Sequence, residues 1–173
     1  MTNFKEALQH VKGFAFDVDG VLSSPKVYVS PDGELIRTMN TKDGYAIQYA
    51  VKRGYPVAII TGARSELVGI RFRNLGLRDI YLGSSNKVND FEDYISRYGF
   101  GAEEILYMGD DLPDFYVMQK AGIACAPSDA VEEIKAISDY ISHFGGGEGC
   151  VRDVIEQVLR LHGRWMDGEA FVW

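Results

Sequence analysis

The sequence has few residues of the kinds that build metal centres from nitrogen and sulfur ligands. Its two cysteines, Cys125 and Cys150, lack the close spacing of a metal site, and its three histidines are scattered along the chain. A zinc site and a disulfide framework are therefore not expected, because both need such residues at characteristic spacings. Two isolated cysteines also fit a reducing compartment, so a cytoplasmic location is predicted.

Basic residues are outnumbered by acidic ones, 18 against 25. The formal net charge is -7 at pH 7, and no basic run or patch compensates it. This balance argues against a nucleic-acid-binding or membrane-binding protein. The chain has no apolar stretch of membrane-spanning length, and its start lacks the pattern of a signal peptide. If the protein acts on an anion, its site must supply positive charge locally.

Hydrophobic residues are plentiful enough for one good core. They make up 46% of the 173 residues, so we expect one domain over residues 1–173. Apolar runs alternate with segments of helical periodicity, which predicts an α/β fold whose mostly parallel sheet is flanked by helices. The expected strands are Phe14–Phe16, Pro56–Ile60, Asp79–Leu82, Ile105–Met108, Ile123–Ala126 and Tyr140–Ser142. The expected helices are Asp43–Lys52, Ser65–Leu75, Val88–Tyr98, Asp114–Lys120, Ala130–Ile137 and Cys150–Leu161.

One segment interrupts this alternation. Residues 26–38 combine two strand-like runs with the turn sequence Pro31-Asp32-Gly33, in which proline presets φ and glycine accepts the left-handed conformation. A β-hairpin is therefore predicted, and an apolar hairpin that projects from a core is expected to be covered. The aromatic tail at 163–173 is likewise expected to dock on its own or on a neighbouring subunit.

The most informative segment is Asp17-Val18-Asp19-Gly20, which follows the first apolar strand. Two carboxylates at the end of a buried strand are costly unless a cation or a reaction needs them. Residues i and i+2 of a strand point to the same face, so both acids can address one site. Gly20 permits the sharp turn that leads the chain away from that site.

Other polar residues also follow the expected strands. Thr61-Gly62 follows the run Pro56–Ile60, Lys87 opens a helix, and Gly109-Asp110-Asp111 with Asp114 follows the run Ile105–Met108. Because ligands bind beyond the carboxyl ends of parallel strands, we expect these residues at one edge of the sheet. Carboxylate oxygens crowded in this way need a cation and favour Mg²⁺.

This set of residue types suits phosphate chemistry. Thr61 and Lys87 are candidates to hold phosphoryl oxygens, Asp17 to attack phosphorus, and Asp19 to protonate the leaving oxygen and then activate water. Each piece also has a simpler interpretation: an acidic turn, the start of a helix, or a surface lysine. The order and placement of all the pieces together favour the catalytic interpretation.

That order resembles the haloacid dehalogenase superfamily of aspartate-nucleophile phosphatases, through Asp17-Val18-Asp19-Gly20, Thr61-Gly62, Lys87 and Gly109-Asp110-Asp111 with Asp114. The resemblance implies a Rossmann-like core in which Asp17 forms an aspartyl-phosphate and Asp19 is the general acid/base. It also implies Mg²⁺ held by Asp17, the main-chain carbonyl of Asp19 and Asp110, with Asp111 or Asp114 in the second shell.

The spacing of these motifs leaves no room for the cap domain that superfamily members acting on small substrates usually carry. Only roughly forty residues separate Asp17 from Thr61, too few for a helical domain as well as the core helix. The chain is therefore expected to be capless, with the hairpin in place of a cap. Such an enzyme must act on a macromolecule or have its site closed by a neighbouring subunit.

The second option fits one family over nearly the whole chain. The sequence resembles the 3-deoxy-D-manno-octulosonate 8-phosphate phosphatases, whose reaction yields the free sugar acid for lipopolysaccharide. The matching segments are Asp17–Leu22, Asn40–Gly44, Thr61–Arg64, Gly83–Lys87, Gly109–Leu112 and Gly146–Asp153. The resemblance implies a homotetramer whose hairpins pack together and whose active sites are each roofed by an adjacent subunit.

The same resemblance supplies candidates for substrate recognition. Arg71 matches the substrate-facing arginine of the family, and its guanidinium can form a fork with the carboxylate of a sugar acid. Gly147 and Arg152, in and after the glycine run, are further candidates, beside Thr61-Gly62 and Lys87 for the phosphate. The expected partner is therefore a phosphorylated sugar acid.

Three alternatives remain open at this point. A sister family hydrolyses 9-phosphates of nine-carbon, sialic-type sugar acids, although Ala63 and Asn74 favour the eight-carbon substrate. A phospho-acceptor receiver module also gathers Asp, Thr and Lys around Mg²⁺, but it places its acceptor on a later strand than Asp17. A catalytically idle scaffold built around the hairpin is the third, and the retained catalytic residue types argue against it.

Overall fold

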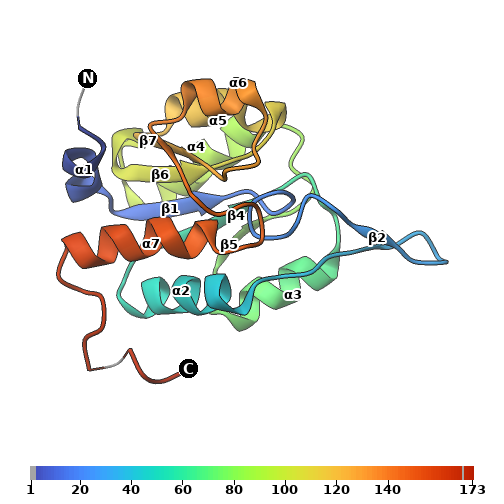
Figure 1. Ribbon diagram of the computed structural model, residues 1–173, viewed down its shortest axis with the longest axis horizontal. Coiled ribbons are helices and arrows are strands. Elements are labelled where there is room, and N and C mark those ends of the chain that lie inside the picture. Colours follow the sequence, from blue (N-terminus) through green and yellow to red (C-terminus); the bar gives the residue numbers. More distant parts are fainter. Residues whose placement is uncertain (1–2, 169) are drawn as a thin grey trace.

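The computed structural model of the protein describes residues 3–168 and 170–173, and its centre is a parallel β-sheet (Figure 1). Six strands lie in the order β5-β4-β1-β6-β7-β8, and every neighbouring pair is parallel. The predicted mostly parallel sheet is therefore confirmed. The strands are β1 (Gly13–Phe16), β4 (Val57–Ile60), β5 (Asp79–Tyr81), β6 (Ile105–Met108), β7 (Ile123–Ala126) and β8 (Tyr140–Ile141).

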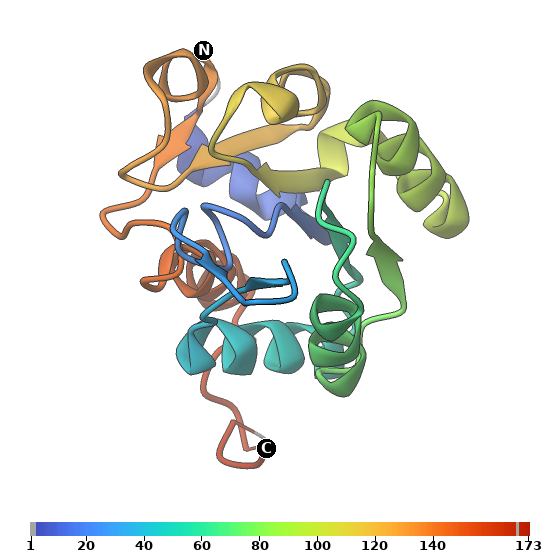
Figure 2. The ribbon, with the colours of Figure 1, turned by 90° about the vertical axis from the view of Figure 1, so that its right-hand side faces the viewer.

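Helices cover both faces of this sheet (Figures 1 and 2). One face carries α2 (Thr41–Lys52), α3 (Glu66–Asn74) and α7 (Cys150–Leu161), and the other carries α4 (Lys87–Tyr98), α5 (Phe115–Lys120) and α6 (Glu132–Ile137). The short helical segments are α1 (Phe4–Ala7), η1 (Leu8–His10), η2 (Ala102–Glu104) and η3 (Leu112–Asp114). The predicted helices are all present, whereas the short segments α1, η1, η2 and η3 are not among the predicted elements.

The observed start of a helix differs from the predicted one where a capping side chain determines its first residue. Helix α2 begins two residues before the predicted start, because the side chain of Asn40 accepts a hydrogen bond from the backbone N–H of Lys42. Asn86 caps α4 in the same way, accepting from the backbone N–H groups of Val88 and Asn89. This cap matters for function because it fixes Lys87 as the first residue of its helix.

The strands bury side chains on both faces, as expected of a parallel sheet between two helical layers. Phe14 and Phe16 of β1 pack in the hydrophobic cluster that includes α2 and α7. Ala15, between them, faces the second cluster together with Tyr107 of β6. Because strand residues alternate between the faces, the two clusters share one sheet and hold its carboxyl edge in a fixed position.

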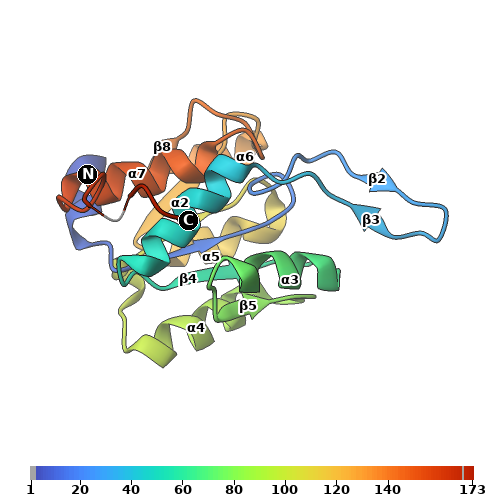
Figure 3. The same cartoon turned by 90° about the horizontal axis from the view of Figure 1, so that it is seen from below.

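The β-hairpin extends away from this core (Figure 3). Its paired segments, β2 (Tyr28–Val29) and β3 (Leu35–Ile36), are antiparallel and shorter than the predicted span. All four paired residues are apolar or aromatic and exposed, Tyr28 and Val29 by 69% and 70%. Between β1 and β4 the chain contains this hairpin and α2, so no cap domain is inserted there.

The glycine run is a packing element. A Cβ atom on Gly146 would lie 2.1 Å from the carbonyl oxygen of Gly20, and one on Gly147 would lie 2.6 Å from the backbone nitrogen of Ser24. Gly147 also has φ +72°, which L side chains rarely adopt. The run therefore lets two backbones meet directly, next to the loop that carries the acidic pair.

The C-terminal tail docks on its own chain. The ring of Trp165 lies edge-on to Tyr49 of α2, with centroids 5.3 Å apart. The hydroxyl of Tyr49 donates to the carboxylate of Asp167 at 2.7 Å. The expected docking thus occurs within the subunit, while Phe171 and Trp173 remain largely exposed.

Of the helices in the described part of the chain, none has the length and apolar character to cross a bilayer.

Candidate active site

A cavity of about 750 Å³ opens at the carboxyl edge of the sheet. It lies where β1 stands between β4 and β6, the position at which the strand order reverses direction. The lining includes eight of the predicted residues: Asp17, Asp19, Thr61, Gly62, Lys87, Asp110, Asp111 and Asp114. The expectation that the strand-end residues converge on one edge therefore agrees with the geometry.

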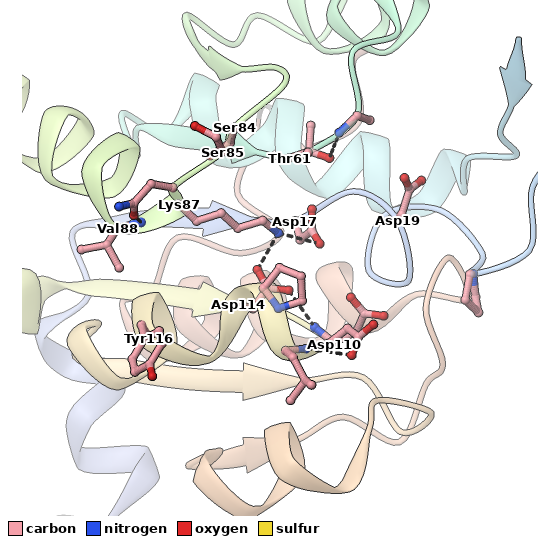
Figure 4. A pocket seen from close by; sticks show the side chains of 17 residues that line it. Asp17, Asp19, Thr61, Ser84, Ser85, Lys87, Val88, Asp110, Asp114 and Tyr116 are labelled. Carbon is pink, nitrogen blue, oxygen red and sulfur yellow. Dashed lines mark hydrogen bonds and ion pairs between the residues drawn. The ribbon is translucent and has the colours of Figure 1, made fainter.

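Lys87 joins two of the acids (Figure 4). Its amine nitrogen lies 2.8 Å from Oδ2 of Asp17 and 2.7 Å from Oδ1 of Asp114. The hydroxyl of Tyr107 donates to the same Oδ1 of Asp114 at 2.7 Å. All four residues are buried. A buried ammonium group between two carboxylates is held in place by charge-assisted hydrogen bonds, so Asp17 has one fixed orientation.

The crowding of acids changes their proton affinities. Burial, followed by the charge of Asp114, raises the pKa of Asp17 to about 7, although Lys87 opposes this rise. Burial and the charges of Asp17 and Asp114 raise the pKa of Asp110 to about 8. Negative charges close to one another disfavour the ionised forms of these carboxyl groups. Lys87 alone therefore does not neutralise the negative charge of these carboxylates, and a further cation would stabilise their ionised forms.

The positions of the carboxylates suit a divalent cation. Carboxylate oxygens of Asp17, Asp110 and Asp114 all lie within 4.8 Å of one another. Gly20 makes room for this arrangement: it has φ +80°, and a Cβ atom there would lie 1.9 Å from Oδ2 of Asp110. The donor set consists of hard oxygen atoms, which suits Mg²⁺ better than softer metals.

Asp114 and Asp111 differ in their burial. The side chain of Asp114 is fully buried. Besides the hydrogen bonds from Lys87 and Tyr107, it accepts one from the backbone N–H of Asp110 at 3.3 Å. Asp111 is exposed and accepts from the backbone N–H of Leu112 at 2.8 Å, as the N-cap of η3. Asp114 thus lies with the metal-type cluster, and Asp111 stands at its rim.

Thr61 is buried at the end of β4, next to β1. Its hydroxyl oxygen accepts a hydrogen bond from the backbone N–H of Ala63 at 3.1 Å, which leaves the hydroxyl proton available for a bound group. Thr61 and Lys87 therefore offer a hydroxyl donor and a cation to the same cavity, the groups expected to bind a phosphoryl group.

Asp19 has a partner that the sequence did not predict. Both of its carboxylate oxygens accept from Arg37, Oδ1 from Nε at 2.5 Å and Oδ2 from Nη2 at 2.9 Å. The hydroxyl of Ser23 donates to Oδ1 at 3.2 Å. No local pattern distinguishes Arg37 in the sequence, because it stands 18 residues after Asp19, at the end of the hairpin.

Three predicted substrate contacts do not line this cavity in the described subunit. Arg71 lies against α2, where a Cβ atom on Gly44 would come within 2.5 Å of its guanidinium. The carbonyl of Gly147 accepts from the side chain of Asn40 at 3.2 Å. Arg152 lies over the ring of Trp165 at 5.3 Å and lines a different cavity.

Sequence reasoning also missed Tyr107. It lies within the buried strand β6, two residues before Gly109, and its polar hydroxyl is the only sign of a special role there. Its partner Asp114 lies seven residues further on. A hydroxyl facing a buried carboxylate across a turn is a tertiary feature, so no spacing rule anticipates it.

Comparison with known proteins agrees with this geometry. A family model described as haloacid dehalogenase-like hydrolase matches residues 70–150. The fold and the site thus define a haloacid dehalogenase-like hydrolase. The chain is 37% identical to the 3-deoxy-D-manno-octulosonate 8-phosphate phosphatase KdsC of Salmonella typhi over 94% of this chain and 87% of that protein. The chain belongs to the 3-deoxy-D-manno-octulosonate 8-phosphate phosphatase family, and the predicted resemblance is confirmed.

Solved structures of the family superpose closely on this chain. The phosphatase of Yersinia pestis matches with a TM-score of 0.91 and 31% identity, covering 94% of this chain and 88% of that one. The Moraxella catarrhalis phosphatase, determined with a magnesium ion, a phosphate ion and KDO, gives 0.88 and 33%, covering 93% and 92%. This membership excludes the receiver-module alternative.

Proposed function

We propose that the protein is a Mg²⁺-dependent phosphatase that converts 3-deoxy-D-manno-octulosonate 8-phosphate to the free sugar acid and phosphate, in the synthesis of a lipopolysaccharide precursor. The observation that carries this proposal is Asp17 itself. It is buried at the end of the central strand, paired with Lys87, and surrounded by an oxygen donor set that fits Mg²⁺. Relatives of matching length carry this activity in their names.

The reaction follows from the placement of these side chains. In the first half, a carboxylate oxygen of Asp17 forms a bond to phosphorus, the bond from phosphorus to the sugar oxygen breaks, and Asp19 gives that oxygen its proton. In the second half, Asp19 takes a proton from water as the water oxygen attacks phosphorus. Asp17 is then released, and inorganic phosphate is formed.

Lys87 and Thr61 hold the phosphoryl oxygens during both halves, and Lys87 also fixes Asp17. Asp17, the carbonyl of Asp19 and Asp110 would hold Mg²⁺, with Asp114 and Asp111 supporting them. When bound, the ion neutralises the charge that gathers on the carboxylates and the phosphoryl group. Gly62 completes the phosphate-binding edge beside Thr61.

The sugar portion needs a second subunit. The cavity is open, and none of Arg71, Gly147 and Arg152 lines it within one chain. We propose a homotetramer in which the exposed hairpins pack together and an adjacent subunit brings substrate-binding groups over the opening. The four exposed apolar residues of β2 and β3 support this assembly, because apolar strands of this kind are normally covered.

The deciding experiment is steady-state kinetics with two sugar acids. The eight-carbon 8-phosphate should give the higher kcat/KM, and a higher value for a nine-carbon 9-phosphate would replace the proposed substrate. The Asp17→Asn variant should lose at least about 10³-fold in kcat while remaining folded, since it loses the nucleophile and little volume. Unchanged turnover in that variant would show that Asp17 is not the nucleophile.

We further propose that residues 1–173 act as one phosphatase domain, with the hairpin at about 26–38 and the tail at about 163–173 as its extensions. Both hydrophobic clusters pack on the two faces of a single sheet, which supports this division. A cytoplasmic location is proposed from the two cysteines, which are free and buried and so fit a reducing environment.

A further inference from the structure

Arg37 forms a bidentate ion pair with Asp19 at the rim of the active-site cavity. The guanidinium contacts both carboxylate oxygens, at 2.5 and 2.9 Å. The side chain of Arg37 is 6% exposed, whereas that of Asp19 is 40% exposed and lines the cavity. The arginine is thus shielded behind the acid, and the acid faces the space that a substrate would enter.

The base of the hairpin is built to hold this pair. Arg37 directly follows β3, where the chain returns from the hairpin toward α2. Ser23 forms isolated β-bridges with Asp19 on one side and with Met39 on the other. Its hydroxyl also donates to Asp19. Both arms of the hairpin are therefore attached to the loop that carries Asp19.

This arrangement limits the rotation of the Asp19 side chain. A planar guanidinium that binds both oxygens of a carboxylate fixes the plane of that carboxylate as well as its position. A second Nη atom of Arg37 donates to the carbonyl of Leu35 at 2.8 Å, so the arginine is itself anchored to the hairpin. The orientation of Asp19 is consequently set by a residue outside the motifs.

We propose that Arg37 is a positioning residue for Asp19, through which the hairpin sets the geometry of proton transfer. The inference rests on the proposed function, in which Asp19 moves the proton. A purely structural role, in which the pair only attaches the hairpin to the core, is the competing interpretation. The two differ in which rate constants should respond when Arg37 is replaced.

The test compares two small phosphate esters, so that sugar recognition does not enter. Glycerol phosphate has an alcohol leaving group that needs a proton, and p-nitrophenyl phosphate has a leaving group that departs without one. Arg37→Met should lower kcat/KM for glycerol phosphate by roughly 10- to 100-fold, within the usual contribution of a general acid. For p-nitrophenyl phosphate the change should stay within about threefold, because kcat/KM reports steps up to leaving-group departure.

Two further variants complete the set. Arg37→Lys, which keeps one charged donor, should recover part of the lost rate for glycerol phosphate. In an Asp19→Asn background, Arg37→Met should change the rate by less than about twofold, because a residue acting through Asp19 has no further effect once Asp19 is disabled. Arg73→Met is the matched control, since Arg73 makes an exposed pair with Glu66 on α3 and does not line the active-site cavity.

An equal loss for both esters, or an undiminished effect of Arg37→Met in the Asp19→Asn background, would overturn the inference. A crystal structure of the Arg37→Met or Arg37→Lys protein gives a readout free of turnover. An unchanged Asp19 orientation in it would also overturn the inference, even if no ester were hydrolysed. Hydrolysis of both small esters without turnover of the eight-carbon sugar phosphate would instead refute only the proposed substrate.

Discussion

The amine nitrogen of Lys87 lies 2.8 Å from a carboxylate oxygen of Asp17, and the two side chains are only 6% and 10% exposed. Asp17 follows the end of β1 and Lys87 begins α4, so the pair joins two positions 70 residues apart in the sequence. Lys87 supplies part of the positive charge that this acidic site needs to bind a phosphate group, and a bound divalent cation would supply the rest.

Replacing Lys87 by Met should reduce both stability and activity. The change leaves Asp17 and Asp114 without their shared cation in a buried site, and breaking a buried pair in this way costs about 3–5 kcal/mol. Chemical denaturation in EDTA should show this loss, and kcat should fall by at least about 10²-fold. Lys120→Met is the control, because Lys120 pairs with Glu92 at the surface and such pairs contribute about 0–1 kcal/mol. Comparable losses in both variants would contradict the prediction.

Metal binding should stabilise the protein more strongly at high pH. The pKa values of Asp17 and Asp110 are raised from 3.8 to about 7 and about 8. The folded state therefore holds these protons more tightly than the unfolded state. The associated stability is complete below about pH 4 and is lost as pH rises toward 8. In EDTA, Tm should fall across this interval.

Saturating Mg²⁺ should counter this fall, because it favours the ionised carboxylates. At a hundredfold excess over Kd it adds about 2.7 kcal/mol, or roughly 5–10 °C in Tm. Differential scanning fluorimetry at pH 5.5 and pH 8 measures the effect, which should be larger at pH 8. The Asp110→Asn variant should show little response to Mg²⁺ at either pH. A larger Mg²⁺ effect at pH 5.5 would show that other groups control binding.

Tyr107→Phe tests the support of Asp114. The change removes the hydroxyl that donates to Asp114 at 2.7 Å and leaves the aromatic ring in place. Loss of one hydrogen bond to a buried charged group should cost about 1.5–3 kcal/mol in the free energy of unfolding. Tyr81→Phe removes a hydroxyl donated to Asp93 at an exposed position and should change stability by less than about 0.5 kcal/mol. Equal effects would mean that the Tyr107 hydroxyl has no special role.

The hairpin should govern assembly. Replacing Tyr28 and Ile36, which face each other across the two strands, by Asp should shift the proposed tetramer to smaller species in light scattering. Charged residues on an apolar contact surface must be desolvated if the contact forms. Activity on the sugar phosphate should fall, and activity on p-nitrophenyl phosphate should persist. A tetramer of unchanged mass would place the subunit contacts elsewhere.

The tail should stabilise α2 without taking part in the chemical step. Truncation after Gly163 removes Trp165 from Tyr49 and the carboxylate of Asp167 from Tyr49 and Arg53. We expect a loss of about 1–3 kcal/mol in stability with kcat/KM for p-nitrophenyl phosphate unchanged. Asp167→Asn should reproduce part of the loss. A truncated protein with wild-type stability would show that this docking contributes nothing.

The order of strands and helices could be predicted from the sequence because it is a local property of the chain. Apolar runs such as Val57–Ile60 are long enough for a strand and too short for a helix, and turns follow them directly. Asp17, Thr61 and Asp110 each follow such a run, so the parallel sheet necessarily gathers them at one edge. The roles proposed for them rest on that placement.

Only the tertiary structure decided which groups surround these acids. Arg37 reaches Asp19 across the base of the hairpin, and Tyr107 reaches Asp114 across a turn, and neither contact leaves a periodic trace in the sequence. The tertiary structure also placed Arg71 and Arg152 away from the cavity of their own subunit. Sequence determined the chemistry because residue type and strand position are local, whereas side-chain partners depend on how distant segments pack.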